Sequence, residues 1–257
     1  SMCWLLLYTS FFGSIFASPP REVPAHLYDA FTLGKTIPVY SWYIDNSYPR
    51  DQPLVFRVEE IDRWINKAKQ REKGYYGETD RYLYEILDQY ASWIEGKRVG
   101  IIGSTIPWYE SMILAYGGQC TTIDYNKIVS EDPRIQTMTV EEYEQNPQKF
   151  DVILSISSLE HDGLGRYGDP INPNGDLETM FKMKRMLSKE GFLILAVPVG
   201  KDAIYWNAHR VYGALRLPLL FGNWQVVDSR GFVQSDLDVN GYAGHQPVFV
   251  LQICSNP

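Results

Sequence analysis

The chain has 257 residues, at the upper end for one domain, and its 45% hydrophobic content is enough for a sizeable core. Charged residues make up 21% of the chain and the formal net charge is −7, so the composition excludes a disordered protein and shows no electrostatic footprint for nucleic acid. The three cysteines are far apart and odd in number, which is typical neither of a disulfide framework nor of a metal-ligand spacing. We therefore expect a small-molecule partner rather than a polyanion.

The N-terminal stretch "MCWLLLYTSFFGSIFASPP" has features of both a targeting signal and a packed segment. It has an apolar centre and small residues near Ala17, but no positive charge precedes the centre, and Thr9 and Ser10 interrupt it. The run is too short and broken to predict a membrane span, and the chain contains no Asn-X-Ser/Thr glycosylation sequon. We expect a cytoplasmic protein. The secretory pathway is the alternative if this segment is a signal or an anchor.

Residues 1–96 are predicted to form a helical and irregular extension that packs on the core. Apolar side chains recur at helical spacing from Val58 to Ala68 and again from Tyr82 to Ile94, and Gly96 follows as a stop signal. Proline-rich stretches on both sides of "TIPVYSWYID" predict a loop-like section before the first of these helices. The aromatic stripe on the second helix could cover a ligand pocket, although such stripes are more often core.

From Lys97 onward, strands and helices alternate. Seven strands are predicted, in chain order KRVGIIG, CTTIDYN, RIQTMT, FDVILSIS, FLILAVPVG, WQVVDSRGF and HQPVFVLQIC. RIQTMT is a weaker pattern than the others, and of the last two strands only HQPVFVLQIC has an uninterrupted apolar run. Helical patterns follow the first, third and fourth strands, and residues 208–222 are expected to form a helix before the sixth. The alternation predicts an α/β domain over residues 97–257 with a doubly wound, mostly parallel sheet and helices on both faces. Ligands of such sheets bind at the carboxyl ends of the strands.

Two strand ends favour a nucleoside cofactor. Gly103 ends the first strand, where the chain must turn tightly and a ligand can approach the backbone. Asp124 ends the second strand, and a carboxylate there can accept hydrogen bonds from both ribose hydroxyls. Each residue also has a simpler explanation, as a turn glycine or as a cap, and it is their combination that favours the cofactor. A nicotinamide cofactor is the rival, but the G-x-G-x-x-G signature is missing, so S-adenosylmethionine fits better.

At these positions the chain resembles class I S-adenosylmethionine-dependent methyltransferases, which have a Rossmann-like fold. The resemblance rests on "VGIIGS", "TIDYN", "FDVILSISSLEH" and "MKRMLSKEGFLILAVP", and it covers about Lys97 to Cys254. More narrowly, "SLEHDGLGRYGDPINPNGD" with "WNAHRVYG" resembles a methyltransferase-like family named as a Caenorhabditis protein of unknown function. The first motif of the superfamily usually carries two or three glycines and an acid, whereas this chain has only Gly100 and Gly103 and no acid.

The resemblance implies that the matching positions bind S-adenosylmethionine. Those expected at the methionine and sulfonium end are Gly103, Ser104, Ser155 and Ser157. Those expected at the ribose and the adenine are Asp124, Tyr125, Thr137 and Met138.

The polar stretch after the fourth strand, residues 158–176, is expected to hold the catalytic base. Methyl transfer to a hydroxyl requires removal of a proton, and His161 is the candidate because it follows the strand directly and its ordinary pKa suits neutral pH. Asp162 could orient His161 or replace it. In the simpler interpretation, Glu160 and His161 only tie the loop to the sheet.

Polar side chains of this stretch and of a later segment are predicted to bind the acceptor. They are Arg166, Asp169, Asn172, His209 and Arg210. Such side chains in a flexible loop suit a small polar or glycan-like acceptor, although a structural role is equally open for the last two. Loop aspartates could instead hold Mg²⁺, but their spacing is too loose to predict a metal site.

The sequence therefore predicts an S-adenosylmethionine-dependent methyltransferase that methylates an oxygen of such an acceptor. A non-catalytic binding module on a degenerate methyltransferase fold is the alternative, because the glycine motif is depleted. A nicotinamide-dependent reductase is a weaker third hypothesis, and the oligomeric state is left open.

Overall fold

In the computed structural model, the described residues are 18–47, 53–240 and 245–255. The N-terminal segment on which the prediction of localisation depends lies outside these ranges. Among the helices within them, none is long and apolar enough to cross a membrane.

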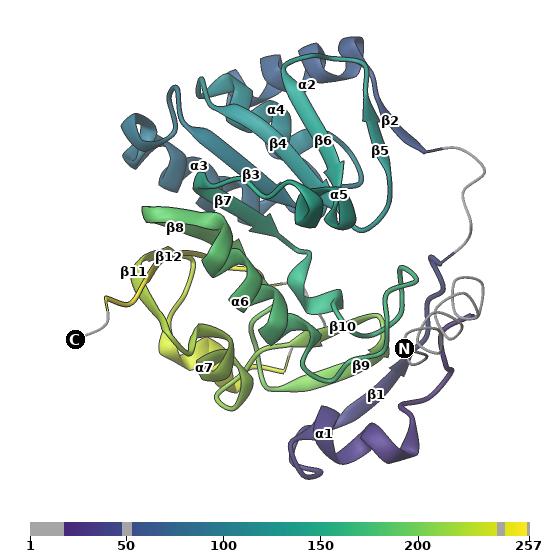
Figure 1. Cartoon of the computed structure of the whole chain (residues 1–257). Coiled ribbons are helices and arrows are strands. Elements are labelled where there is room, and N and C mark those ends of the chain that lie inside the picture. The colour runs from purple at the N-terminus through teal and green to yellow at the C-terminus, as the bar shows by residue number, and fades with distance from the viewer. Residues whose placement is uncertain (1–17, 48–52, 241–244, 256–257) are drawn as a thin grey trace, which may run out of the picture.

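A seven-stranded sheet forms the centre of the molecule (Figure 1). In chain order its strands are β3 (Arg98–Ile102), β4 (Gln119–Asp124), β6 (Ile135–Thr139), β7 (Phe150–Ile156), β8 (Leu187–Ala196), β11 (Trp224–Arg230) and β12 (Val248–Ile253). Across the sheet the order is β11-β12-β8-β7-β3-β4-β6. The strands from β6 to β8 are parallel neighbours, and β12 runs antiparallel to both β8 and β11. The predicted α/β fold with a seven-stranded, mostly parallel sheet is confirmed.

Helices cover both faces of this sheet. One face packs against α2 (Val58–Lys69), α3 (Glu78–Gln89) and α4 (Trp108–Ala115), and the other against α5 (Val140–Gln145), α6 (Gly175–Met186) and α7 (Arg216–Phe221). Successive side chains of a strand point to opposite faces, so Leu154 of β7 packs under the first set of helices and Ile153 under the second. This double burial explains why β7 is a continuous apolar run rather than an alternating one.

A smaller layer lies beside the main sheet, at the lower right of Figure 1. There, β1 (Val39–Trp42) pairs in parallel with β9 (Ala203–Asn207), which pairs in turn with β10 (His209–Val211). The short helix α1 (Tyr28–Thr32) packs against this sheet through Phe31 and Trp206. The remaining elements are the pair β2 (Leu54–Phe56) and β5 (Ile128–Ser130) and the 3₁₀ turns η1 (Ala25–Leu27), η2 (Ala91–Trp93), η3 (Leu159–His161) and η4 (Gln234–Asp238).

The helix predicted over residues 208–222 is wrong in its first half. The chain forms β10 there, and only α7 is helical. The section predicted to be loop-like around residue 40 contains β1. β1 is defined by its pairing with β9, which lies far away in the sequence, and no local pattern reports that pairing. β10 pairs with the preceding strand β9, and this pairing decides against the helix that its residues would also fit.

The order of strands places the ligand crevice. From β3 the chain moves to β4 and β6 on one side, and from β7 to β8 on the other, so the topological switch point lies between β3 and β7. Open α/β sheets bind ligands outside the carboxyl ends of the strands at such a point.

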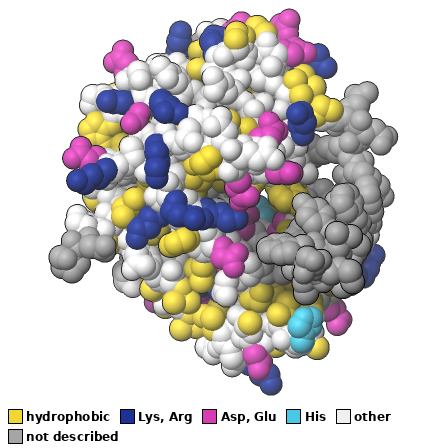
Figure 2. All heavy atoms as spheres, viewed as in Figure 1, with side chains coloured by type: hydrophobic (Ala, Val, Ile, Leu, Met, Phe, Trp, Pro, Cys, Tyr) yellow, Lys and Arg dark blue, Asp and Glu magenta, His cyan; other side chains and the backbone are white. Residues whose placement is uncertain are grey.

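Acidic and basic side chains are interspersed over the face seen in Figure 2, with a row of Lys and Arg across its middle.

Candidate functional site

Backbone hydrogen bonds tie together the carboxyl ends of β3 and β4. Gly103 has a φ of 76°, and its N–H donates to the Ile123 carbonyl at 3.0 Å. The next N–H, that of Ser104, donates to Asp124 Oδ2 at 3.0 Å. A side chain at position 103 would both strain the backbone and collide with the loop after β7, because its Cβ would lie 2.2 Å from Ser158 Oγ. Glycine is therefore required at this turn, and the turn holds the Asp124 carboxylate in place.

The other residues predicted at the ribose and adenine lie around this turn. Tyr125 follows Asp124 and is 56% exposed. The Thr137 hydroxyl donates to the Ile128 carbonyl at 2.8 Å, and Met138 packs partly buried against the core. The structure thus brings Tyr125 to the surface beside Asp124, while Thr137 and Met138 have contacts within the protein.

A buried glutamate lies near the Ser104–Asp124 bridge and was not predicted. Glu110, in the first turn of α4, is fully buried, and its Oε2 accepts a hydrogen bond from the Thr122 hydroxyl at 2.7 Å. Its Oε1 has no partner within the described part of the chain. Burial, with a contribution from the charge of Asp124, raises the pKa of Glu110 to about 7. No local pattern marked this acid as part of the site, because it follows the glycine motif instead of preceding it.

Four polar side chains gather at the carboxyl end of β7, and we call them the β7 polar cluster. They are Tyr76, Ser157, Glu160 and Gln246. The Ser157 hydroxyl donates to Glu160 Oε1 at 2.8 Å and accepts from Gln246 Nε2 at 3.1 Å. The Tyr76 phenol interacts with the same hydroxyl, and burial raises its pKa. The sequence did not predict Tyr76 and Gln246, which come from the loop before α3 and from the residues just before β12.

The β7 polar cluster contains two oxygens that lack a hydrogen-bond donor among the described residues. They are Glu160 Oε2 and Gln246 Oε1, and both side chains are buried, that of Glu160 with 1% exposure. Burial raises the pKa of Glu160 to about 7. Ser155, two residues before Ser157, is also fully buried, and its Oγ has no partner in the same part of the chain.

The imidazole of His161 is fixed beside the β7 polar cluster. Its Nδ1 lies 2.6 Å from the Ala208 carbonyl, so Nδ1 carries the proton, and its Nε2 lies 3.5 Å from Glu160 Oε1. Burial, helped by the charge of Arg166, lowers the pKa of His161 to about 3. The ring is therefore neutral at physiological pH, and its free lone pair faces Glu160.

The aspartates of the loop after η3 accept hydrogen bonds from other groups of the protein. Asp162 Oδ2 accepts a hydrogen bond from the Thr179 hydroxyl at 2.7 Å, and burial raises the pKa of Asp162 to about 7. Asp169 Oδ2 accepts the Gly163 N–H at 2.7 Å. Across the described ranges, no group of three or more His, Cys, Asp and Glu side chains could hold a metal ion.

Arg166 and Asn172 border the same loop and are half-buried. The Arg166 guanidinium donates to Asn46 Oδ1 at 2.9 Å and to the Ala208 carbonyl at 3.2 Å. The Asn172 amide donates to Glu178 Oε2 at 2.9 Å. These contacts hold the loop against Asn46, which follows β1, and against α6.

His209 and Arg210, also predicted to contact the acceptor, are buried beneath the loop. Arg210 donates to the Asp162 carbonyl at 2.6 Å and lies 3.7 Å from Asp176 Oδ2. Asp176 also receives two hydrogen bonds from Arg216, at 2.6 and 2.9 Å. Burial alone would raise the pKa of Asp176, but the two guanidiniums hold it below its ordinary value. His209 stacks on Tyr205 at a centroid distance of 5.2 Å.

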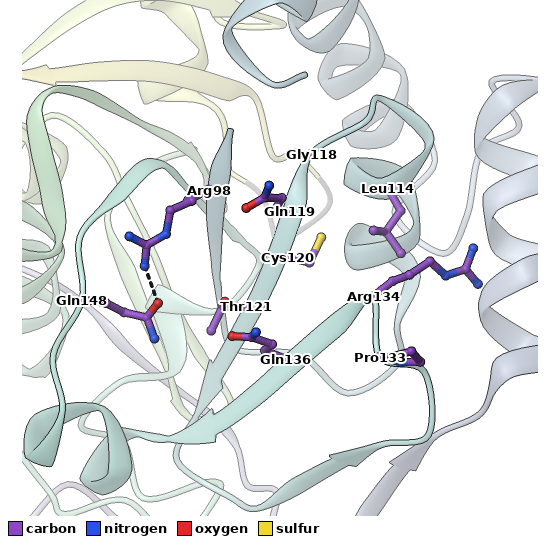
Figure 3. Close-up of a pocket in the computed structure, with 10 residues that line it drawn as sticks. All are labelled: Arg98, Leu114, Gly118, Gln119, Cys120, Thr121, Pro133, Arg134, Gln136 and Gln148. Carbon is purple, nitrogen blue, oxygen red and sulfur yellow. Dashed lines mark hydrogen bonds between the residues drawn. The ribbon is translucent and has the colours of Figure 1, made fainter. Parts of the chain in front are cut away.

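A cavity of about 470 Å³ lies at the opposite edge of the sheet (Figure 3). It is formed by the amino ends of β3, β4 and β6, where Arg98, Gln119 and Gln136 line it, and Arg98 donates to Gln148. Parallel α/β sheets bind ligands at the other edge, so this cavity is separate from the crevice.

The fold is similar to that of a solved methyltransferase, and two further solved structures match the chain more weakly. The Burkholderia thailandensis 1,6-didemethyltoxoflavin-N1-methyltransferase, solved with 1,6-didemethyltoxoflavin and S-adenosylhomocysteine, is 16% identical with a TM-score of 0.52, covering 84% of this chain and 100% of that one. The PH0226 protein of Pyrococcus horikoshii OT3 is 12% identical with a TM-score of 0.48, covering 73% and 95%. The CcbJ methyltransferase of Streptomyces caelestis is 9% identical with a TM-score of 0.44, covering 66% and 89%. At this low identity, the similarity to the Burkholderia thailandensis structure shows the fold of this chain, which is the Rossmann-like methyltransferase fold.

The family is shown by the sequence itself. No curated protein matches the chain. Residues 96–240, more than half of the 257, match the family described as Caenorhabditis protein of unknown function, DUF268. The chain, which has a methyltransferase fold, belongs to this family, as the motifs of its polar loop predicted.

Proposed function

We propose that the protein is an S-adenosylmethionine-dependent methyltransferase that methylates an oxygen of a small polar or glycan-like acceptor. One observation carries the proposal. The Asp124 carboxylate, fixed by the Ser104 N–H, and the buried β7 polar cluster lie at neighbouring strand ends on either side of the Gly103 turn. A nucleoside held at one side would present its reactive end at the other.

The residues on the Asp124 side of the Gly103 turn suit the cofactor. Asp124 offers carboxylate oxygens for the ribose hydroxyls, Gly103 leaves the backbone bare, and the exposed ring of Tyr125 can stack on the adenine. Thr137 and Met138 would flank the adenine edge from β6, and Ser104, Ser155 and Ser157 would face the methionine and the sulfonium. S-adenosylmethionine would supply the methyl group. The fold shared with a methyltransferase solved with S-adenosylhomocysteine supports this assignment.

The residues on the β7 side of the Gly103 turn suit a methyl acceptor that loses a proton. A base placed on the η3 loop, where the sequence pointed to His161 and Asp162, would stand next to the sulfonium end. Arg166, Asp169 and Asn172 lie in the loop that borders the crevice and would contact a polar acceptor. His209 and Arg210 are buried, so we propose that they act by holding this loop in place.

Isothermal titration with S-adenosylhomocysteine tests the proposal. We expect saturable binding, and at least a tenfold loss for Asp124→Asn, which corresponds to about 1.4 kcal/mol. Asp151→Asn is the matched control, because Asp151 also accepts a backbone N–H of a neighbouring strand, that of Arg98 at 2.9 Å, but at the opposite edge. A protein that binds neither S-adenosylhomocysteine nor S-adenosylmethionine at millimolar concentration is no methyltransferase.

The depleted glycine motif favours one other function, a non-catalytic binding module with a crevice that no longer accepts the cofactor. Absence of binding in the titration would select this alternative. Quenching of protein fluorescence by NAD would instead point to a nicotinamide enzyme, for which the chain lacks the G-x-G-x-x-G signature.

A further inference from the structure

We propose that Glu160 is the group that accepts the proton of the methyl acceptor, with Gln246 binding a second donor of the same molecule. This inference rests on the proposed function and deepens it, since it assigns the base and restricts the acceptor to a molecule with two hydrogen-bond donors. Ser157 and Tyr76 act as positioning residues for the carboxylate.

The first step of the argument is the place of the carboxylate. Glu160 belongs to η3, the turn directly after β7, and β7 is the hydrogen-bonded neighbour of β3 across the switch point. The close approach of Ser158 to Gly103 shows that the η3 turn and the β3 turn are in contact. A cofactor held at Asp124 and running over Gly103 would therefore end at η3.

The second step is the pattern of hydrogen bonds. The one hydroxyl hydrogen of Ser157 is directed to Glu160 Oε1, so Gln246 must turn its Nε2 to Ser157 and leave its Oε1 free. Glu160 Oε2 and Gln246 Oε1 are then two buried acceptors without a donor in the described ranges. A buried acceptor that is left without a donor destabilises the folded protein. Two neighbouring hydroxyls of a polyhydroxylated acceptor would satisfy both.

The third step compares the two candidate bases. The Nδ1–H of His161 is committed to the Ala208 carbonyl, and burial with a nearby arginine makes the imidazole a weak base with a pKa of about 3. The Glu160 carboxylate, with a pKa raised to about 7, is the stronger base and matches neutral pH. His161 therefore only packs beside Glu160, with its Nε2 3.5 Å from Oε1, and it is Ser157 that donates the hydrogen bond holding the carboxylate.

The reaction balances with these groups alone. The acceptor O–H bond breaks as the oxygen forms a bond to the methyl carbon, and the sulfur–carbon bond breaks with its electron pair remaining on sulfur. The proton passes to Glu160 Oε2, which becomes a neutral acid, and it leaves to solvent when the products depart. The sulfonium charge disappears, and one proton is released.

Sinefungin provides the test, because it carries an amine where S-adenosylmethionine carries the transferable methyl, whereas S-adenosylhomocysteine carries nothing there. We expect the full-length protein to bind sinefungin at least tenfold more tightly than S-adenosylhomocysteine. Glu160→Gln should reduce this ratio to about one and leave the affinity for S-adenosylhomocysteine unchanged. His161→Gln should keep most of the preference, and Glu190→Gln, an exposed glutamate of β8 at the opposite edge, should keep all of it.

The outcomes are distinguishable. No binding of S-adenosylhomocysteine by the unsubstituted protein overturns the proposed function, and this inference with it. Binding without a sinefungin preference, or a preference lost in His161→Gln but kept in Glu160→Gln, overturns the assignment of Glu160 alone. Should Glu160→Gln fail to fold, the unsubstituted protein still tests the assignment. Its preference must increase as the pH rises from 6 to 8 and Glu160 ionises, and a constant ratio would refute it.

Discussion

Three carboxyl groups in and around the crevice, those of Glu110, Glu160 and Asp162, share one physical property. Burial raises the pKa of each to about 7. Asp176 is equally buried, but two arginines hold its pKa below the ordinary value. The difference lies in what surrounds each group, since an unpaired buried acid favours the proton and a paired one favours the charge. The site therefore contains three acids whose charge changes near neutral pH and one, Asp176, whose charge does not.

The raised pKa of Glu110 predicts a stability that depends on pH. A carboxyl group whose pKa is higher in the folded state stabilises fully below its unfolded pKa, near 4.5, and this contribution is lost as the pH rises through about 7. Glu110→Gln removes the dependence. The difference in free energy of unfolding between the variant and the unsubstituted protein should shift in favour of the variant by about 2–3 kcal/mol from pH 5 to pH 8. Urea denaturation at both values measures this gain, and an equal difference at both would contradict the prediction.

The buried pair of arginines predicts a large loss for Asp176→Asn. The substitution leaves Arg210 and Arg216 buried without their counter-charge, and breaking such a pair costs about 3–5 kcal/mol. Asp62→Asn, which removes an exposed partner of Arg134, should cost about 1 kcal/mol or less. Urea denaturation at pH 7 compares the two. Similar losses for both variants would show that the buried network contributes little.

How much of the site could be predicted from the sequence depends on the distance along the chain. Gly103 and Asp124 end their strands, so local pattern and topology together place them at one edge. Tyr76 and Gln246 lie far from Ser157 in the sequence and meet it only after the sheet has formed, so no spacing reports them. The weak basicity of His161 was also beyond prediction, because it follows from the burial of the ring.

At the scale of elements, one aspartate links the helices on the first face of the sheet. Asp80 of α3 is fully buried and accepts hydrogen bonds from the Gly74 N–H at 2.7 Å, Trp108 Nε1 at 3.0 Å and the Tyr109 hydroxyl at 2.8 Å. The last two residues start α4, the helix that follows the Gly103 turn. The loop that Asp80 holds also carries Tyr76 to the β7 polar cluster. Helix α3 therefore positions both sides of the crevice.

This linkage predicts that Asp80→Ala affects stability and ligand binding together. Three donors, one of them the buried indole N–H of Trp108, lose their acceptor, which should cost about 2–4 kcal/mol in free energy of unfolding. S-adenosylhomocysteine should bind several-fold more weakly, because the helix after the Gly103 turn is released. Tyr109→Phe removes one donor and should cost about 1 kcal/mol with little effect on binding. Urea denaturation and titration of both variants check this, and a stable Asp80→Ala protein with normal affinity would refute it.

The sequence predicted the elements of the main sheet more fully than those of the small one. Central strands of the main sheet such as β7 are buried on both faces, so they appear as apolar runs that need no partner to be recognised, whereas the edge strands β6 and β11 give weaker patterns. In contrast, β1 is a largely exposed strand, and it is defined by its pairing with β9. The residues of β10 also fit a helical pattern, and only their neighbours decide between the two.

In the molecule as a whole, residues 53–96 form part of the hydrophobic core and are not a surface addition to it. Helices α2 and α3 and the turn after them contribute buried apolar side chains to the cluster under the first face of the sheet. These are Ile61, Ile65, Leu83, Ile86, Leu87 and Ile94. Their burial is worth on the order of 10 kcal/mol, which is comparable to the entire stability of an ordinary domain. We therefore propose that the folding unit begins near residue 53, whereas the sequence pattern placed the boundary after residue 96.

Truncation tests where the folding unit begins. A fragment of residues 97–257 would expose the first face of the sheet, so we expect no cooperative urea transition and no near-ultraviolet circular dichroism. A fragment of residues 53–257 keeps both helices and, among the described elements, loses η1, α1 and β1, whose contacts centre on Phe31 and Trp206. It should unfold cooperatively, with a lower free energy than the chain from residue 18. Cooperative unfolding of the 97–257 fragment would show instead that residues 1–96 are an accessory to a core that folds without them.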